Sequence, residues 1–153
     1  MTKALGKYEI LEELGAGSMS VLYRGRDTVL EREVAIKTIY TGAVDPELKQ
    51  RFYREARSCA RLQHPHIVTV YDFGEQEGVA YIAMELLSGM DLRRVIARKR
   101  PFALETKLEI LAQVCDGLAH AHRFEIVHRD IKPGNIFIQD DERAKILDFG
   151  IAR

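Results

Sequence analysis

The sequence predicts an α+β fold in two lobes, with a strand-rich first lobe and a mostly helical second lobe. Two observations lead to this prediction. Five strand-type runs of apolar and β-branched residues lie before residue 86, most of them joined by short polar links. From residue 91 onwards, apolar residues recur mainly at three- and four-residue spacing, as on helices. We expect the two lobes to comprise residues 1–87 and 88–153.

The first lobe should contain a five-stranded antiparallel sheet and one helix. The expected strands are residues 8–15, 20–27, 33–40, 67–73 and 79–85. The helix should begin at Asp45-Pro46, because proline is favoured in a first helical turn, and it should end before Pro65. Its apolar positions are Leu48, Phe52, Cys59 and Leu62.

The second lobe should contain helices at residues 91–98 and 104–122, followed by short strands at 136–138 and 144–147. One apolar stripe runs along the longer helix, formed by Leu108, Leu111, Cys115 and Leu118. Because Cys115 and Cys59 both lie in apolar helical patterns, we expect them to be buried free thiols.

Composition narrows the class of protein. The formal net charge is zero, with no basic excess of the kind that nucleic-acid binding requires. The single basic cluster, at residues 93–100, is interpreted as a solvated helix face. No signal peptide or membrane span is recognisable, and two distant cysteines suit a reducing compartment. We therefore expect a cytoplasmic chain, with a membrane anchor conceivable outside it.

Two features of the first lobe suggest phosphate binding. Gly15 and Gly17 lie between two strands, where small residues let backbone N–H groups approach phosphate oxygens. Lys37 ends the run Val-Ala-Ile-Lys in an otherwise apolar strand, where an ammonium needs an anionic partner. Glu55 offers one, since helical spacing places it near the inward face of the following helix. Taken alone, these features also fit a plain hairpin turn and two surface charges.

Two further features lie in the second lobe. Residues 128–135 read His-Arg-Asp-Ile-Lys-Pro-Gly-Asn, and apolar strand-like segments on both sides would hold these polar groups in a rigid loop. Asp148-Phe149-Gly150 follows a short apolar strand and supplies a second oxygen ligand for a hard cation. A charged surface loop is the alternative for either feature by itself.

Taken in this order, the four motifs resemble the signature set of protein kinases. The resemblance covers residues 8–153. It is nearest to bacterial Ser/Thr kinases of the eukaryotic-like type, and Lys132, two residues after Asp130, is typical of Ser/Thr-specific members. It implies ATP and Mg²⁺ as cofactors, a Ser- or Thr-containing protein as substrate, and a role in phosphorylation-based signalling.

The resemblance also implies residue roles. Lys37 would hold the α- and β-phosphates and pair with Glu55, and Asp130 would accept or orient the proton of the substrate hydroxyl. Lys132 would neutralise the γ-phosphate, while Asn135 and Asp148 would bind Mg²⁺. The implied nucleotide-binding residues are Leu14, Gly15, Gly17, Leu22, Ala35, Lys37, Met84, Glu85, Leu87, Asp91 and Phe137. The column that reports an active kinase would be Cys59, Val70, His128 and Phe149.

The pattern departs from the family at two points. Ser20 replaces the third glycine of the loop, which should stiffen it. The chain ends three residues after Gly150, so we expect a truncated helical lobe without an activation segment or docking groove. Leucines exposed on its long helix would each lose roughly 1.5–3 kcal/mol of burial. The alternative functions are a non-catalytic, pseudokinase-like fragment that binds nucleotide or a partner, and a fragment without a function of its own.

Overall fold

The computed structural model describes residues 4–17, 20–41 and 46–149, except for the side chains of Leu48 and Glu55. Contacts divide the chain into two units. Unit 1 comprises Met1–Ala60 with Val70–Leu86, and unit 2 comprises Arg61–Thr69 with Leu87–Arg153. The segment Arg61–Thr69 therefore groups with the second unit, whereas the sequence places it in the first lobe.

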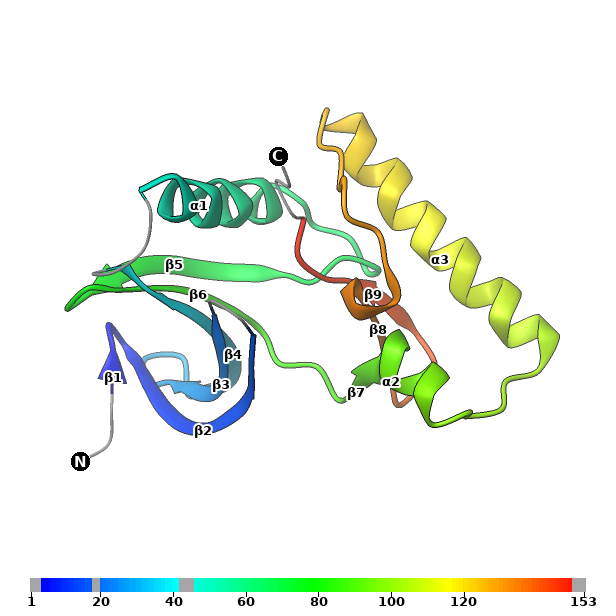
Figure 1. Ribbon diagram of the computed structural model, residues 1–153, viewed down its shortest axis with the longest axis horizontal. Coiled ribbons are helices and arrows are strands. Elements are labelled where there is room, and N and C mark those ends of the chain that lie inside the picture. The colour runs from blue at the N-terminus through cyan, green and yellow to red at the C-terminus, as the bar shows by residue number, and fades with distance from the viewer. Residues whose placement is uncertain (1–3, 18–19, 42–45, 150–153) are drawn as a thin grey trace. The chain divides into compact units, whose positions relative to one another are not determined.

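Unit 1 is built on a curled antiparallel sheet with the strand order β1-β2-β3-β4-β6-β5 (Figure 1). The strands are β1 (Ala4–Leu5), β2 (Tyr8–Ala16), β3 (Val21–Asp27), β4 (Arg32–Tyr40), β5 (Val70–Gln76) and β6 (Val79–Glu85). Five of them correspond to the expected strands. The sixth, β1, has two residues and extends the sheet beyond β2, too short to produce a periodic signal in the sequence.

Alternation along these strands separates two faces of the sheet. One face carries the core of the unit, including Val34, Ile36, Tyr81 and Ala83, all of them buried. Tyr8 packs edge-on against Tyr81 in this core, with ring centroids 5.8 Å apart. The intervening residues of β3, β4 and β6 therefore lie on the opposite face, which becomes important for the site.

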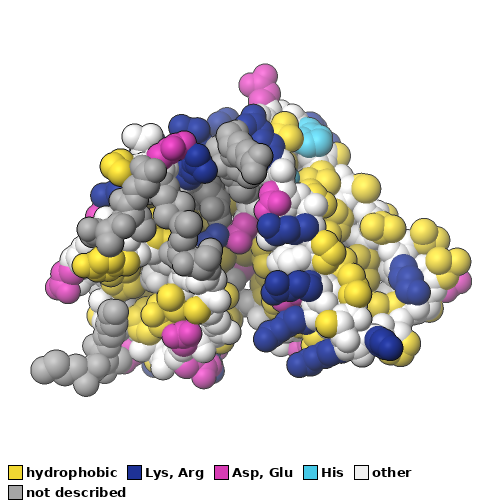
Figure 2. Space-filling model, viewed as in Figure 1, with side chains coloured by type: hydrophobic (Ala, Val, Ile, Leu, Met, Phe, Trp, Pro, Cys, Tyr) yellow, Lys and Arg dark blue, Asp and Glu magenta, His cyan; other side chains and the backbone are white. Residues whose placement is uncertain are grey.

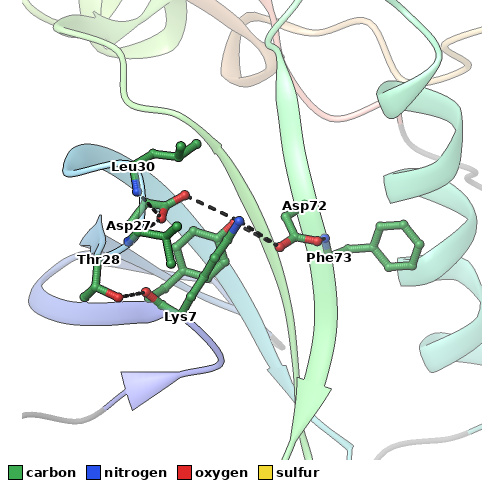
Figure 3. A network of polar contacts seen from close by, with 8 residues as sticks. Lys7, Asp27, Thr28, Leu30, Asp72 and Phe73 are labelled. Carbon is green, nitrogen blue, oxygen red and sulfur yellow. Dashed lines mark hydrogen bonds and ion pairs between the residues drawn. The ribbon is translucent and has the colours of Figure 1, made fainter.

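A polar network ties the start of the sheet together (Figure 3). Asp27, fully buried at the end of β3, accepts hydrogen bonds from the N–H groups of Val29 and Leu30, both 3.0 Å long. The Lys7 ammonium lies 3.5 Å from Asp27 and 3.7 Å from Asp72 on β5. A buried carboxylate is stable only when it is paired or hydrogen-bonded, and Asp27 is both. Through its two ion pairs, Lys7 also holds the β1–β2 turn against β3 and β5.

Helix α1 (Pro46–Ala60) lies along β5 and packs against it (Figure 1). Its buried side chains are Phe52, Ala56 and Cys59, which recur every three or four residues on one side of the helix. Pro46 is its first residue, as expected, and Asp45 lies outside the described residues.

Unit 2 combines helices with a small sheet (Figure 1). Its elements are β7 (Gly89–Asp91), α2 (Leu92–Ala97), α3 (Leu104–Arg123), a 3₁₀ turn η2 (Pro133–Asn135), β8 (Ile136–Gln139) and β9 (Ala144–Ile146). The antiparallel sheet has the order β7-β8-β9. None of the helices in the described part of the chain is long and apolar enough to span a bilayer.

The leucines of the apolar stripe on α3 remain partly or largely exposed, as expected, but the burial expected for Cys115 is wrong. Leu108 and Leu111 are each 58% exposed, and the thiol of Cys115 is exposed rather than buried. The buried positions are instead Ile110, Val114, Gly117 and Ala121. Gly117 allows the close approach, because a Cβ there would lie 2.9 Å from the Ile146 side chain on β9. Helix α3 therefore has two apolar stripes, and only packing decides which one is buried. Apolar side chains also remain visible on the surface of the molecule (Figure 2).

The strand expected at 67–73 is shorter than predicted, since β5 begins at Val70. Ile67 forms an isolated parallel bridge with Ile146, and the Val68 N–H donates to the Ile146 carbonyl at 2.9 Å. Apolar periodicity correctly indicated burial at these positions, but it does not identify the partner that buries them.

Candidate active site

The glycines of the first motif lie at the end of β2 and directly after it. Gly15 pairs with Leu22 next to an irregularity of β2 at Leu14, which is largely exposed. The Gly17 N–H donates to the Ser20 carbonyl at 2.7 Å. A Cβ at Gly15 would meet nothing within 4 Å, so the space beside this strand is open. Ser18 and Met19 lie outside the described residues.

Next to these glycines, four predicted residues share the face of the sheet opposite the core. Lys37 on β4 pairs with Leu22 on β3, and Ala35 pairs with Met84 on β6. Directly paired residues of antiparallel strands project to the same face, as do residues two apart on one strand. Leu22, Ala35 and Met84 thus form an apolar surface with one ammonium beside it. Ala35 and Met84 are buried, whereas Leu22 and Lys37 are partly exposed.

Two more predicted nucleotide-binding residues lie where the chain leaves this sheet. Glu85 ends β6, opposite Val34, and Leu87 follows in the connecting segment. Both are partly buried. Their role in nucleotide binding stays a prediction.

In unit 2, His128 anchors the loop of residues 128–135. Its ring is 1% exposed, Nε2 lies 2.8 Å from the Leu147 carbonyl, and the Asp130 N–H approaches Nδ1 at 3.3 Å. A carbonyl can only accept and an N–H can only donate, so these partners select the neutral ring with its proton on Nε2. Burial lowers the pKa of His128, which agrees with a neutral ring. Phe149 packs on the ring, with centroids 4.8 Å apart.

The Asp130 carboxylate is the centre of this loop. Its Oδ2 accepts hydrogen bonds from Lys132 Nζ at 2.6 Å and from Asn135 Nδ2 at 3.1 Å. Asn135 Nδ2 also donates to the Asp130 carbonyl at 2.9 Å. Chiefly because of the hydrogen bond from Lys132, the pKa of Asp130 lies below its ordinary value. Asp130 is therefore ionised at neutral pH. Its side chain is also accessible to solvent.

Backbone bonds hold Asp148 next to this loop. The N–H of Leu147 donates to the Asn135 carbonyl at 2.9 Å, and the Leu147 carbonyl accepts from His128. Both backbone groups of Leu147, the residue before Asp148, are therefore held by hydrogen bonds. Asp148 itself has φ = 38°, an uncommon backbone conformation for a residue other than glycine. Such conformations persist where neighbouring contacts enforce them, often at functional sites.

Asp91 and Phe137 face each other across strands β7 and β8. The Asp91 carboxylate caps helix α2, with Oδ1 accepting the Arg94 N–H at 2.9 Å, and Arg93 lies 3.8 Å away. Asp91 therefore has a structural role that sequence reasoning did not assign, and its role in nucleotide binding stays a prediction. Phe137 is partly buried.

The side chains predicted to bind a metal suit Mg²⁺. Asn135 uses only its Nδ2 for its two hydrogen bonds, so its amide oxygen Oδ1 remains a possible ligand among the described residues. Asp148 supplies a carboxylate, and Mg²⁺ commonly takes one or two such protein ligands together with phosphate oxygens. Within the described ranges, no group of three or more His, Cys, Asp or Glu side chains offers a competing site.

The structure thus assembles the predicted residues as two separate sets. Unit 1 brings together Leu22, Ala35, Lys37 and Met84, and unit 2 brings together Asp130, Lys132 and Asn135 with Asp148 held alongside. The Glu55 side chain, the predicted partner of Lys37, lies outside the described residues, although its backbone belongs to α1. Sequence reasoning did not find the role of Leu147, because it acts through its backbone and leaves no side-chain signal.

Comparison with known proteins identifies the family. The protein kinase domain model matches residues 8–153. The chain belongs to the protein kinase family. It is 45% identical over 148 residues to the serine/threonine-protein kinase PrkC of Bacillus subtilis, and 43% identical over 152 residues to the serine/threonine-protein kinase PknB of Mycolicibacterium smegmatis. The family assignment agrees with the four motifs and with the α+β fold.

Both alignments cover 96% of this chain but only 23% of PrkC and 24% of PknB. The probable serine/threonine-protein kinase pknA2 of Bifidobacterium longum is 41% identical, with 97% of this chain and 20% of the relative covered. The chain therefore spans about a quarter or less of the length of these relatives. The relatives are Ser/Thr kinases by name, and the chain is a kinase by family.

Proposed function

We propose that this chain supplies the nucleotide-binding and phosphoryl-transfer residues of a Ser/Thr protein kinase, which transfers the γ-phosphate of MgATP to Ser or Thr hydroxyls of a protein. The observation that carries the proposal is the arrangement of polar groups around the Asp130 carboxylate. An ionised, solvent-accessible carboxylate is held by Lys132 and Asn135, and backbone bonds keep the loop beside Asp148. Phosphoryl transfer requires mainly positioning and charge stabilisation, which rigidly held polar groups provide.

In the proposed reaction, Asp130 orients the substrate hydroxyl and accepts its proton as the oxygen attacks the γ-phosphorus. A bond forms between the hydroxyl oxygen and phosphorus, and the bond to the β-phosphate oxygen breaks, so that ADP leaves. Lys132, already 2.6 Å from Asp130, is placed to offset negative charge on the transferred group. When bound through Asn135 and Asp148, Mg²⁺ would supply further charge neutralisation at the phosphates.

For the nucleotide, the apolar surface of Leu22, Ala35 and Met84 suits a flat base, and Lys37 on the same face suits the α- and β-phosphates. Leu14, Glu85, Leu87, Asp91 and Phe137 complete the proposed site. Gly15 and Gly17 are the proposed cover over the phosphates. The proposed pair of Lys37 with Glu55 would fix the ammonium against α1.

The decisive experiment measures phosphoryl transfer from radiolabelled ATP in the intact protein and in Lys37→Met. We expect the intact protein to incorporate phosphate into Ser and Thr residues, and Lys37→Met to lose this incorporation. Circular dichroism should show that Lys37→Met is still folded. MgATP binding without Lys37-dependent transfer would instead favour a non-catalytic nucleotide-binding module. Transfer that persists in Lys37→Met would contradict the assigned role of Lys37.

A further inference from the structure

A carboxylate on β5, remote from the motifs, collects an unusual number of donors. Glu75 Oε1 accepts from Thr41 Oγ1 at 2.9 Å and from Lys49 Nζ at 3.0 Å. Its Oε2 accepts from Tyr53 OH at 2.8 Å and lies 2.7 Å from Lys49 Nζ. Both oxygens are thus engaged by three side chains from two other segments, the end of β4 and helix α1.

This cluster differs from an ordinary surface ion pair, which contributes little because two long side chains must be immobilised in high-dielectric solvent. Here the Tyr53 ring is also held by Phe73 on the same strand as Glu75, with ring centroids 6.0 Å apart. The hydrogen bonds from Lys49, Tyr53 and Thr41 lower the pKa of Glu75 to about 2, so the carboxylate is fully charged at neutral pH.

The cluster acts on one flank of α1. Lys49 and Tyr53 are four residues apart, so they lie one turn above the other on the helix. At about 100° per residue, both lie to one side of the buried stripe of Phe52, Ala56 and Cys59, while position 55 lies on the other side. Since α1 packs chiefly on β5, Glu75 fixes the roll of the helix about its axis.

A rotation of α1 about its axis would displace a side chain on the opposite flank of the helix. A rotation of about 20° moves a side-chain tip about 6 Å from the helix axis by about 2 Å. That displacement is enough to break a hydrogen-bonded ion pair, and a misplacement of about 1 Å can cost about 100-fold in rate.

We propose that Glu75 is a positioning residue for phosphoryl transfer, which holds α1 through Lys49 and Tyr53 in the orientation that presents Glu55 to Lys37. This inference rests on the proposed function, because Glu55 and Lys37 are assigned there. Glu75 itself touches neither nucleotide nor substrate.

The test compares Glu75→Gln and Tyr53→Phe with the unaltered intact protein. The first substitution keeps the size of the side chain but removes its charge, and the second keeps the ring against Phe73 but removes the hydroxyl donor. We expect turnover to fall roughly tenfold or more in Glu75→Gln and less in Tyr53→Phe. The Michaelis constant for ATP should change much less, because the face of Leu22, Ala35 and Met84 is untouched.

The matched control is Glu33→Gln, which removes another charged partner from the same sheet. Glu33 accepts from Arg24 on the neighbouring strand, and it is not one of the residues that bind Lys49 or Tyr53 of α1. We expect turnover in this variant within about twofold of the unaltered protein, because an exposed ion pair contributes little.

Hydrogen exchange separates positioning from general stability. In Glu75→Gln, amides of residues 46–60 should exchange faster, while those of β4 and β6 keep their protection. Unchanged turnover would overturn the proposal, and so would faster exchange spread evenly over the sheet. If the unaltered protein shows no Lys37-dependent transfer, the proposed function fails. In that case the hydrogen exchange of α1 in Glu75→Gln still shows whether Glu75 holds the helix. The two proposals can therefore be contradicted independently.

Discussion

At the scale of single residues, the site depends on side chains whose protonation is fixed by their neighbours. Asp130 is kept ionised by Lys132 and Asn135, and His128 is kept neutral by a carbonyl on one nitrogen and an N–H on the other. These two states are complementary, since an ionised carboxylate can accept a proton while a neutral imidazole keeps the loop in register.

The neutrality of His128 predicts a pH dependence. Burial lowers its pKa below the ordinary 6.5, so as pH falls the unfolded chain takes up a proton before the folded chain does. The folded state should therefore lose stability as pH drops below about 6.5, down to the folded pKa. The measurement is the free energy of unfolding of the chain from pH 8 to 5.

Replacement of the ring by an amide in His128→Asn should flatten this profile, although stability at pH 8 will be lower. His64 contributes in the same direction, because burial lowers its pKa as well, and His64→Asn serves as the matched comparison. A profile in His128→Asn as steep as in the unaltered chain would contradict the assignment.

At the scale of secondary-structure elements, α3 shows how one helix can carry two apolar stripes. Ile110, Val114, Gly117 and Ala121 are buried, whereas Leu104, Leu108 and Leu111 are 58–65% exposed. Both sets recur at helical spacing, so the periodicity that correctly indicated a helix could not select its inner face.

Adjacent residues on α3 should therefore differ sharply in their contribution to stability. Ile110→Ala should lower the free energy of unfolding by about 2–5 kcal/mol, since it removes a buried side chain and leaves a cavity. Leu111→Ala, one position further, should change it by no more than about 0.5 kcal/mol. Urea titration of the two variants followed by circular dichroism measures both values. Equal losses would mean that α3 buries the stripe of Leu111 in solution.

Strands show the same limit of local patterns. The segment at 67–73 was predicted as one strand because its apolar residues suit a sheet. In the structure Ile67 and Val68 are buried through β9, and β5 starts only at Val70. By contrast, β3, β4 and β6 were predicted within a residue or so, since each has its partner strand nearby in the fold and a long β-branched or apolar run.

At the scale of the whole molecule, the chain consists of two compact units. In unit 1, core-facing residues of the central strands are fully buried, with Val34, Ile36 and Ala83 at 0% exposure. In unit 2, the first turns of α3 carry several exposed leucines, so this part gains less from burial.

Hydrogen exchange of the chain should reflect this difference. Amides of β4 and β6 should be the slowest to exchange, because they are doubly paired in the middle of the sheet. Amides of residues 104–109 should exchange much faster, since local opening there exposes little additional apolar surface. Mass-spectrometric exchange on residues 1–153 provides the comparison. Equal protection of the two segments would show that the chain unfolds as one cooperative block.

The sequence by itself determined the family and the order of the elements, and it supplied the residues that are proposed for the site. These are encoded locally, in periodicity, turn residues and closely spaced motifs such as residues 128–135. Only the tertiary structure decided which stripe of α3 is buried, that Leu147 pins the loop of Asp130, and that Glu75 binds helix α1. Those features join residues that are distant in the chain or act through the backbone. Local sequence patterns indicate that a side chain is buried, but they do not identify the residues that contact it.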